Sequence, residues 1–177
     1  ILKIENGLNL TNAKEVIDVS QCILTPGLID LHTHVYWGGT SLGIDAEAFC
    51  RKSAVTTAVD TGSSGPGNFA GFKTHIIEKS DVNILAFLHI SHAGIYAFSP
   101  RVMVGESENI SLMDPKTAVE VVEDNRNYIV GIKVRVGKNT SAIEHHHCIH
   151  HLLLLLFLPN HHQCVHLFLQ ELDLVCH

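Results

Sequence analysis

The chain has 177 residues, of which 46% are hydrophobic, and its formal net charge at pH 7 is −6. This composition is typical of a globular protein and excludes a chain that is disordered throughout. The acidic balance, with no basic stripe anywhere in the sequence, argues against a nucleic acid as partner.

Cysteine spacing and hydropathy bear on the cellular compartment. The five cysteines form no CxxC pair, and their odd number does not suggest a disulfide framework, so a reduced cytoplasmic location is expected. The apolar run Leu152–Leu158 is far shorter than the roughly 20 residues that span a membrane. The chain does not open with a signal-peptide pattern, and we expect no membrane partner.

Predicted strands and helices alternate along the first part of the chain. The first strand is expected over residues 15–24, where Val16 and Ile17 supply β-propensity, and Thr25-Pro26-Gly27 predicts a turn after it. The remaining predicted strands cover 28–35, 56–60, 83–91 and 128–136. The predicted helices cover 45–54, with Asp45 as N-cap, 68–79, and a segment that opens at Asp114-Pro115.

This alternation predicts an α/β fold in which the strands are parallel and the helices pack outside them. About four β/α units are present, which is half of a TIM (β/α)8 barrel. We therefore divide the chain into a short N-terminal β segment (1–26), the first half of a barrel (27–138) and a tail (139–177).

The tail has a different composition from the rest of the chain. All 13 glycines and all 12 lysines and arginines precede residue 139, whereas nine of the 14 histidines lie from His145 onward. We interpret this His/Leu-rich segment as lying outside the barrel fold, and a frame-shifted reading is favoured. Adventitious metal binding by its histidines is the alternative.

Two histidines at the end of the predicted strand 28–35 carry the first chemical signal. His32 and His34 are two residues apart, and on a strand this spacing puts both imidazoles on one face. Two neutral imidazoles side by side can bind a divalent ion such as zinc. The alternative is an exposed or hydrogen-bonded histidine pair without a ligand.

The setting of this pair resembles a known family. The segment TPGLIDLHTH is similar to the first barrel strand of the amidohydrolase superfamily, and the segments SAVTTAVDTGSSGPGNF, LAFLHISHAGIYAFS and YIVGIKVRVG follow in the family's order. Together they look like the branch that contains dihydroorotases and D-amino-acid deacetylases. The resemblance covers roughly residues 13–141 of this sequence.

The resemblance implies a binuclear metal site. His32 and His34 match the pair that binds the more buried metal, and Lys133 matches a lysine that carbon dioxide carboxylates so that it bridges two ions, expected to be zinc. Strand alternation independently places Gly131, Lys133 and Arg135 on one face, which would point the lysine into the barrel. The alternative is a lysine paired with a carboxylate at the barrel mouth.

Other parts of the family pattern are not found. The superfamily takes two more histidines and a general-base aspartate from later strands, and no residue here is assigned a catalytic role. Tyr36 stands where dihydroorotases carry an arginine, which favours a deacetylase-like branch. Tyr36 and Arg135 are candidate substrate-binding residues, although Arg135 could equally form a salt bridge. For His89 and His92, structural hydrogen bonding is favoured over a place in the site.

The predicted function is therefore that of a metal-dependent hydrolase. Its substrate would be a small acylated molecule with an amide or related ester bond, attacked by water that the metal ions activate. This chain is expected to be an incomplete and inactive piece of such an enzyme. The alternatives are a non-catalytic β/α remnant, a His-rich metal-binding product or a dihydroorotase-like cyclic amidohydrolase, and association into a homo-oligomer is left open.

Overall fold

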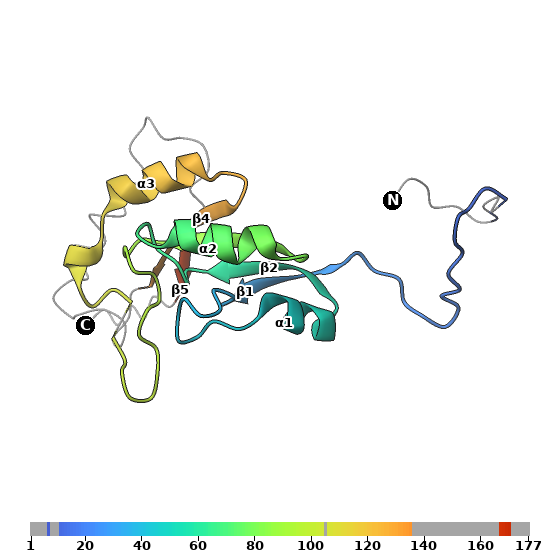
Figure 1. Cartoon of the computed structure of the whole chain (residues 1–177), viewed down its shortest axis with the longest axis horizontal. Helices are drawn as coiled ribbons and strands as arrows, with labels where there is room; N and C mark the ends of the chain where they lie inside the picture. Colours follow the sequence, from blue (N-terminus) through green and yellow to red (C-terminus); the bar gives the residue numbers. More distant parts are fainter. Residues whose placement is uncertain (1–6, 8–10, 105, 136–166, 171–177) are drawn as a thin grey trace, which may run out of the picture.

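Strands and helices alternate in a computed structural model, which describes residue 7, residues 11–104 and 106–135, and the backbone of 167–170 (Figure 1). The strands are β1 (Leu28–Thr33), β2 (Val55–Thr61), β3 (Asn83–His89), β4 (Ile129–Arg135) and β5 (Leu167–Gln170). The helices are α1 (Ala46–Ser53), α2 (Phe69–His75), the 3-10 turns η1 (Ile77–Lys79) and η2 (Ile110–Leu112), and α3 (Pro115–Asp124).

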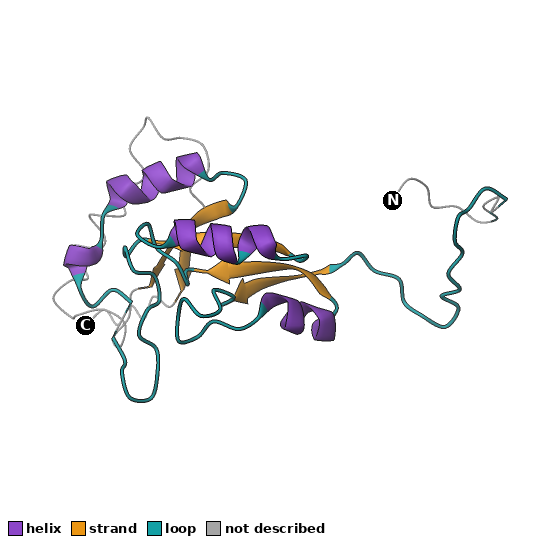
Figure 2. Cartoon of the chain, viewed as in Figure 1, coloured by secondary structure: helices purple, strands orange, loops and turns teal. Residues whose placement is uncertain are grey.

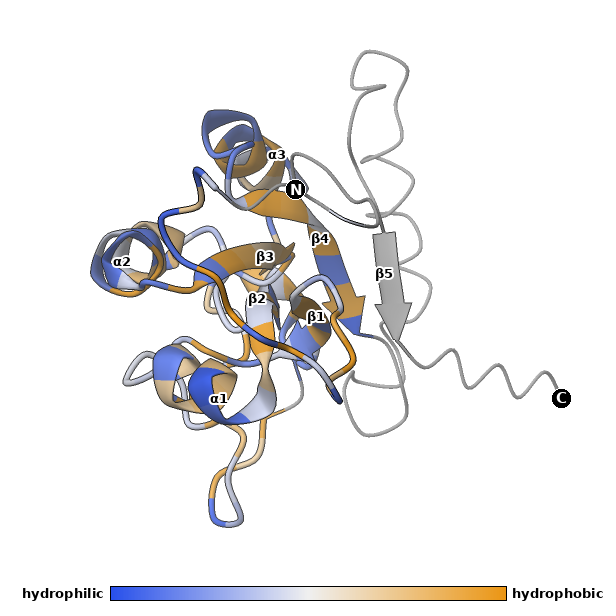
Figure 3. Ribbon diagram, turned by 90° about the vertical axis from the view of Figure 1, so that its right-hand side faces the viewer, coloured by the Kyte–Doolittle hydropathy of each residue, from blue (hydrophilic) through white to orange (hydrophobic). Residues whose placement is uncertain are grey.

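The five strands form one parallel sheet in the order β1-β2-β3-β4-β5. Figure 2 shows the helices as connections between successive strands, and Figure 3 shows α1, α2 and α3 together on one side of the curved sheet. Consecutive parallel strands joined by helices on a single face are the arrangement of a barrel wall. The predicted α/β half-barrel is therefore confirmed.

The hydrophobic core lies between the helices and the outer face of the sheet. Phe69 and Phe72 of α2 are buried with Leu88 of β3 and with Ile132 and Val134 of β4. Burying a side chain of this size stabilises the fold by about 1.5–3 kcal/mol, so these residues fix the helices to the sheet. Because one side of β4 is committed to this core, its alternate residues face the other side of the sheet.

The sequence signals for the helix starts are confirmed. Asp45 is the N-cap of α1 and accepts a hydrogen bond from the backbone of Ala48 at 2.9 Å. Asp114 caps α3 in the same way, and Pro115 occupies its first turn, where a missing N–H costs nothing. The predicted helix over 68–79 is divided: α2 ends at His75, and after Ile76 the chain continues as the 3-10 turn η1.

The strand predicted over 15–24 is wrong. Residues 11–27 contain no strand or helix, and they run away from the sheet as an extended arm (Figure 1). Ile17 is 72% exposed and Ile23 is 93% exposed, so these apolar side chains have no packing partner among the described residues. A strand needs a neighbouring ladder, and β-propensity alone does not supply one; within the described chain β1 pairs with β2 only.

One strand comes from the tail, where the sequence pattern does not predict it. The backbone of β5 pairs in parallel with β4, and Lys133 is in register with Phe168. The rest of the tail lies outside the described residues. In the described part of the chain, no helix has the length and apolar character needed to cross a bilayer.

Candidate metal centre

The two predicted histidine ligands lie together at the carboxyl end of β1. Their ring centroids are 5.4 Å apart, and the ring planes meet at 77°. The backbone around them is fixed, because the carbonyl of His34 accepts a hydrogen bond from Ile44 at 3.0 Å and Thr33 is in register with Asp60 of β2. The spacing on the strand therefore brings the two imidazoles together, as the sequence predicts.

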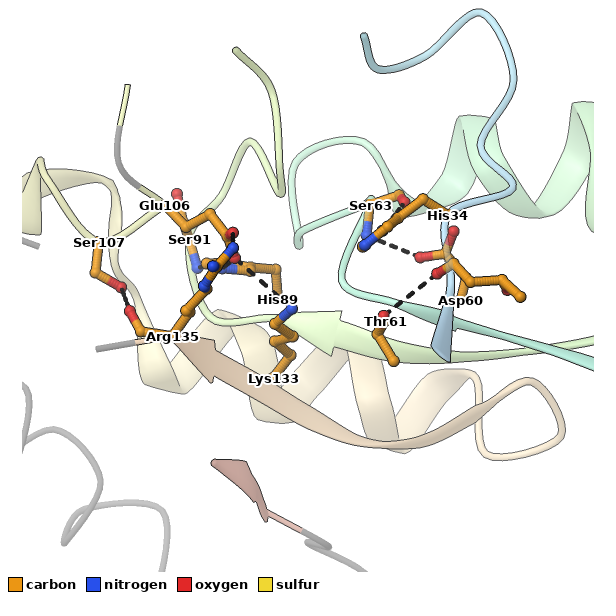
Figure 4. Close-up of polar contacts among 11 residues, drawn as sticks. His34, Asp60, Thr61, Ser63, His89, Ser91, Glu106, Ser107, Lys133 and Arg135 are labelled. Carbon is orange, nitrogen blue, oxygen red and sulfur yellow. Dashed lines mark hydrogen bonds and ion pairs between the residues drawn. The ribbon is translucent and has the colours of Figure 1, made fainter. Parts of the chain in front are cut away.

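His34 is oriented from the loop that follows β2. Its Nδ1 atom lies 3.1 Å from the hydroxyl oxygen of Ser63 (Figure 4). Asp60 holds that serine in turn, since one carboxylate oxygen accepts the Ser63 backbone N–H at 2.8 Å and the other accepts the Val35 N–H at 2.8 Å. If the Ser63 hydroxyl donates to Asp60, it accepts Nδ1–H from His34, which directs Nε2 toward a ligand.

The environment keeps both imidazoles neutral. Burial, followed by the charge of Lys133, lowers the pKa of His34 to about 4. The same two causes, in the same order, lower the pKa of His32. Metal binding requires the neutral form of histidine, so at pH 7 neither side chain has to lose a proton before a cation binds. Burial has the opposite effect on the carboxyl group of Asp60. Its complete burial raises its pKa to about 6, although the hydrogen bonds that it accepts lower the pKa.

Lys133 lies on the inner face of β4, as strand alternation predicts. It is 1% exposed, whereas its neighbours Ile132 and Val134 belong to the hydrophobic core on the other side. Gly62 makes room for it, since a Cβ atom there would lie 3.2 Å from carbon atoms of the lysine side chain. Desolvation lowers the pKa of Lys133, although the nearby charge of Glu106 opposes the shift.

Glu106 is a buried carboxylate that the sequence pattern does not reveal. It lies in the long loop between β3 and α3, and its side chain is 4% exposed. Its oxygens lie 3.2 Å from His89 Nε2, 3.8 Å from Lys133 Nζ and 2.8 Å from Arg135 Nη1 (Figure 4). Burial would raise its pKa, but the hydrogen bonds and charges of these partners lower the pKa to about 2.

Of the other candidate residues, Arg135 and His89 lie in the cluster around Glu106, whereas Tyr36 lies outside it. Arg135 contacts Glu106 and stands beside Lys133 on β4, so it belongs to the same cluster. His89 is fully buried and bonded at both ring nitrogens, to Ser91 N at 2.9 Å and to Glu106. Tyr36 does not join this cluster: its ring stacks on Phe72 with centroids 4.7 Å apart, against α2.

The residues present fit a metal site in part. Two neutral imidazoles and a desolvated lysine amine lie near one another, and the charge of Lys133 affects the pKa of both histidines. No group of three or more histidine, cysteine, aspartate or glutamate side chains in the described ranges is placed to hold a metal ion. Among the described residues, Lys133 is the buried amine on the neighbouring part of the sheet, and a lysine can bind a cation only after it has lost its positive charge.

Known proteins resemble this chain over roughly two thirds to three quarters of its length. No family model matches the chain. A deacetylase of Agrobacterium fabrum is 39% identical over 121 residues, and a deacetylase of Brucella anthropi is 38% identical over 137 residues, which are 68% and 77% of this chain. A crystal structure of a dihydroorotase superimposes with a TM-score of 0.60 at 39% identity, covering 66% of this chain and 36% of its own. The chain spans 29% and 33% of the two deacetylases.

Proposed function

This chain belongs to the deacetylase- and dihydroorotase-like branch of the amidohydrolase superfamily, and on that premise we propose that it carries part of the metal site of a hydrolase. The bond cleaved would be an amide or a related ester in a small acylated substrate. The chain spans about a third of the length of its deacetylase relatives. The hydrolytic activity would therefore belong to the whole enzyme, and this chain would supply part of its metal site.

One arrangement supports the proposal: the rings of His32 and His34 lie 5.4 Å apart at the carboxyl end of β1, and the buried Lys133 of β4 is close enough for its charge to lower the pKa of both histidines. In barrels of this kind, the chemistry takes place at that end. Two divalent ions, for which zinc is the proposed identity, would supply a Lewis acid and an activated water there. The chain's own residues would bind and orient them.

Each residue has a distinct role in this proposal. His32 and His34 would coordinate one ion through neutral imidazole nitrogens, and the Ser63 contact would fix the tautomer of His34. Lys133 would bind both ions after reacting with carbon dioxide, because an unmodified lysine is a cation and repels them. Its burial supports this role, since a desolvated amine loses its proton more readily than an exposed one.

The substrate class is proposed from what surrounds the site. The similarity to two deacetylases and the presence of Tyr36 at the position expected for an arginine both favour an N-acyl substrate. A cyclic amide of the dihydroorotase type is the second candidate, which the 39% identity to a dihydroorotase structure supports. Tyr36 weighs against that candidate, because it packs on Phe72 and offers no charge to a substrate carboxylate.

The metal-binding part of the proposal can be tested on the chain itself. The protein is dialysed against a chelator of intermediate strength, and the zinc that it retains is measured by elemental analysis. We expect the wild type to retain zinc and the double variant His32→Ala/His34→Ala to lose it. The control is His161→Ala/His162→Ala, which removes two tail histidines and leaves the proposed pair intact. Equal retained zinc in the wild type and the His32/His34 variant, with a loss in the tail variant, would instead assign metal binding to the tail.

A further inference from the structure

We propose that a pocket on the helix side of the sheet binds a free α-amino acid with an apolar side chain. The pocket lies between the first turn of α1 and the junction of α2 with η1, and its volume is about 280 Å³. Ligand pockets usually begin near roughly 300 Å³, so this pocket suits one small molecule. Within the described chain its lining includes none of the candidate metal ligands, and the inference does not depend on the proposed function.

The most deeply buried lining residues are apolar. Val35 is 0% exposed and Ala46 is 5% exposed, and both belong to the hydrophobic core between the helices and the sheet. Ile76 adds a half-buried side chain beside them. Trp37 lines the same pocket but is 60% exposed. An aliphatic side chain of a ligand would remove part of this apolar surface from water, which favours binding.

Two carboxylates line the pocket from α1. Asp45 is the N-cap of this helix, and Glu47 belongs to its first turn. The Glu47 carboxylate is held in place, because it accepts the Asp81 backbone N–H at 3.1 Å and a bond from Arg51 at 3.3 Å. Carboxylate oxygens can accept further hydrogen bonds, so both residues can receive an ammonium group. The exposed ring of Trp37 adds to this attraction, since a cation is stabilised over an indole face.

Two nitrogen donors line the pocket from the opposite wall. His75 is the last residue of α2, and Lys79 is the last residue of η1. Neither side chain forms a hydrogen bond or an ion pair within the described part of the chain, whereas nearby Lys73 is paired with Glu78. A carboxylate of the ligand could therefore bind Lys79 and His75 without displacing an existing partner.

The separation of the two charges on different elements selects the class of ligand. A simple anion that reached Lys79 would also meet the carboxylates of Asp45 and Glu47, and a simple cation would meet Lys79. A molecule that carries both an ammonium and a carboxylate avoids either repulsion. A free α-amino acid with an aliphatic side chain combines these two groups with the apolar surface that the buried lining residues match.

The test uses the fluorescence of Trp37, which is the only tryptophan of the chain. The full chain is titrated without added metal, first with leucine and then with three analogues. N-acetylleucine lacks the ammonium, leucinamide lacks the carboxylate, and glycine lacks the aliphatic side chain. We expect a saturable change with leucine, and a half-saturating concentration at least about tenfold higher for each analogue, because each loses a charge-assisted or an apolar contact.

Two substitutions identify which wall holds which group. Lys79→Gln should raise the half-saturating concentration of leucine at least about tenfold and leave that of leucinamide unchanged. Asp45→Asn should weaken leucine binding and leave the binding of N-acetylleucine unchanged, and asparagine preserves the cap of α1. Lys116→Gln, which removes a lysine of α3 outside the pocket, is the matched control and should behave as the wild type.

The binding of leucine should persist in His32→Ala/His34→Ala, because neither histidine lines the pocket. Loss of binding in that variant would place the ligand at the candidate metal centre and overturn the inference. Equal half-saturation by leucine and its analogues, wild-type binding in both Lys79→Gln and Asp45→Asn, or no saturable change with leucine would also overturn it. Each of these three outcomes would leave the proposed metal site untouched.

Discussion

The hydroxyl oxygen of Ser63 lies 3.1 Å from Nδ1 of His34, and this contact joins the loop after β2 to the histidine pair of β1. Ser63 is fully buried, and Asp60 fixes it through a backbone hydrogen bond of 2.8 Å. An imidazole that is held at one nitrogen presents the other in a defined direction, so in the proposed metal site the affinity for a cation would depend on a residue that does not touch the metal.

We expect Ser63→Ala to weaken zinc binding about 10- to 100-fold, which is the usual cost of losing a hydrogen-bond partner of a metal ligand. The matched control is Ser64→Ala, because the adjacent Ser64 hydroxyl is equally buried and has no hydrogen-bond partner in the described structure. Competition with a chromophoric chelator measures both affinities. An equal effect of the two substitutions would show that the His34 contact contributes nothing specific.

Gly62 should resist substitution for two reasons that can be separated. Its backbone has φ +89°, and an added Cβ would lie 3.2 Å from Lys133 and from His89. We expect Gly62→Ala to lower the free energy of unfolding by about 2–3 kcal/mol. Gly38→Ala carries the same backbone strain at φ +77° with open space around it, and should cost only about 1 kcal/mol.

Chemical denaturation of the two glycine variants would measure the difference between their free energies of unfolding. If Gly62→Ala and Gly38→Ala are equally destabilised, the space beside Lys133 is not restricted, and the lysine is packed more loosely than its 1% exposure indicates.

Asp60 should make the stability of the folded chain depend measurably on pH. Burial raises its pKa to about 6 from the ordinary value of 3.8, so the folded state holds the proton more tightly than the unfolded state does. The stability that this group contributes is fully present below pH 4 and is lost as the pH rises toward 6, by about 2–3 kcal/mol in all. The substitution Asp60→Asn removes the titrating carboxyl group, and this contribution should disappear with it.

The measurement compares denaturation midpoints of the wild type and Asp60→Asn between pH 4 and 7, because the difference cancels the titration of other carboxylates. Wild-type stability should fall relative to the variant across this range. A difference that stays constant with pH would mean that Asp60 keeps an ordinary pKa when buried.

The free edge of β1 should promote association of the chain. In the described structure β1 pairs with β2 only, and Ile29 and Leu31 are 59% and 66% exposed. Unpaired backbone groups beside exposed apolar side chains favour edge-to-edge contacts between copies. We expect oligomers or aggregates in size-exclusion chromatography with light scattering, and a smaller associated fraction for Leu31→Lys. A monodisperse wild-type monomer would show that this edge is covered.

Local signals in the sequence predicted most of the fold. The β/α alternation gives β1 to β4, and Asp45 and Pro115 mark the starts of α1 and α3 because capping depends on neighbouring residues only. Residues 15–24 have the composition of a strand but form none, since pairing depends on a neighbour that the segment does not have in the described structure.

The candidate site was predictable only where it lies on strands. His32, His34 and Lys133 follow from the strand period and from the family resemblance. The place of Glu106 in the site could not be predicted from the sequence, because it depends on the path of the long loop between β3 and α3. Glu106 is 17 residues beyond His89, the last residue of β3, so the strand period carries no information on where its side chain lies.

The most direct test of the central claim is a crystal structure of the chain grown with zinc and bicarbonate, with the metals located by anomalous scattering at the zinc edge. The prediction is anomalous density beside His32 and His34, with Lys133 extended by a carboxylate and turned from Glu106 toward the metal. Zinc bound only by histidines of the tail, with an unmodified Lys133 still paired with Glu106, would contradict it.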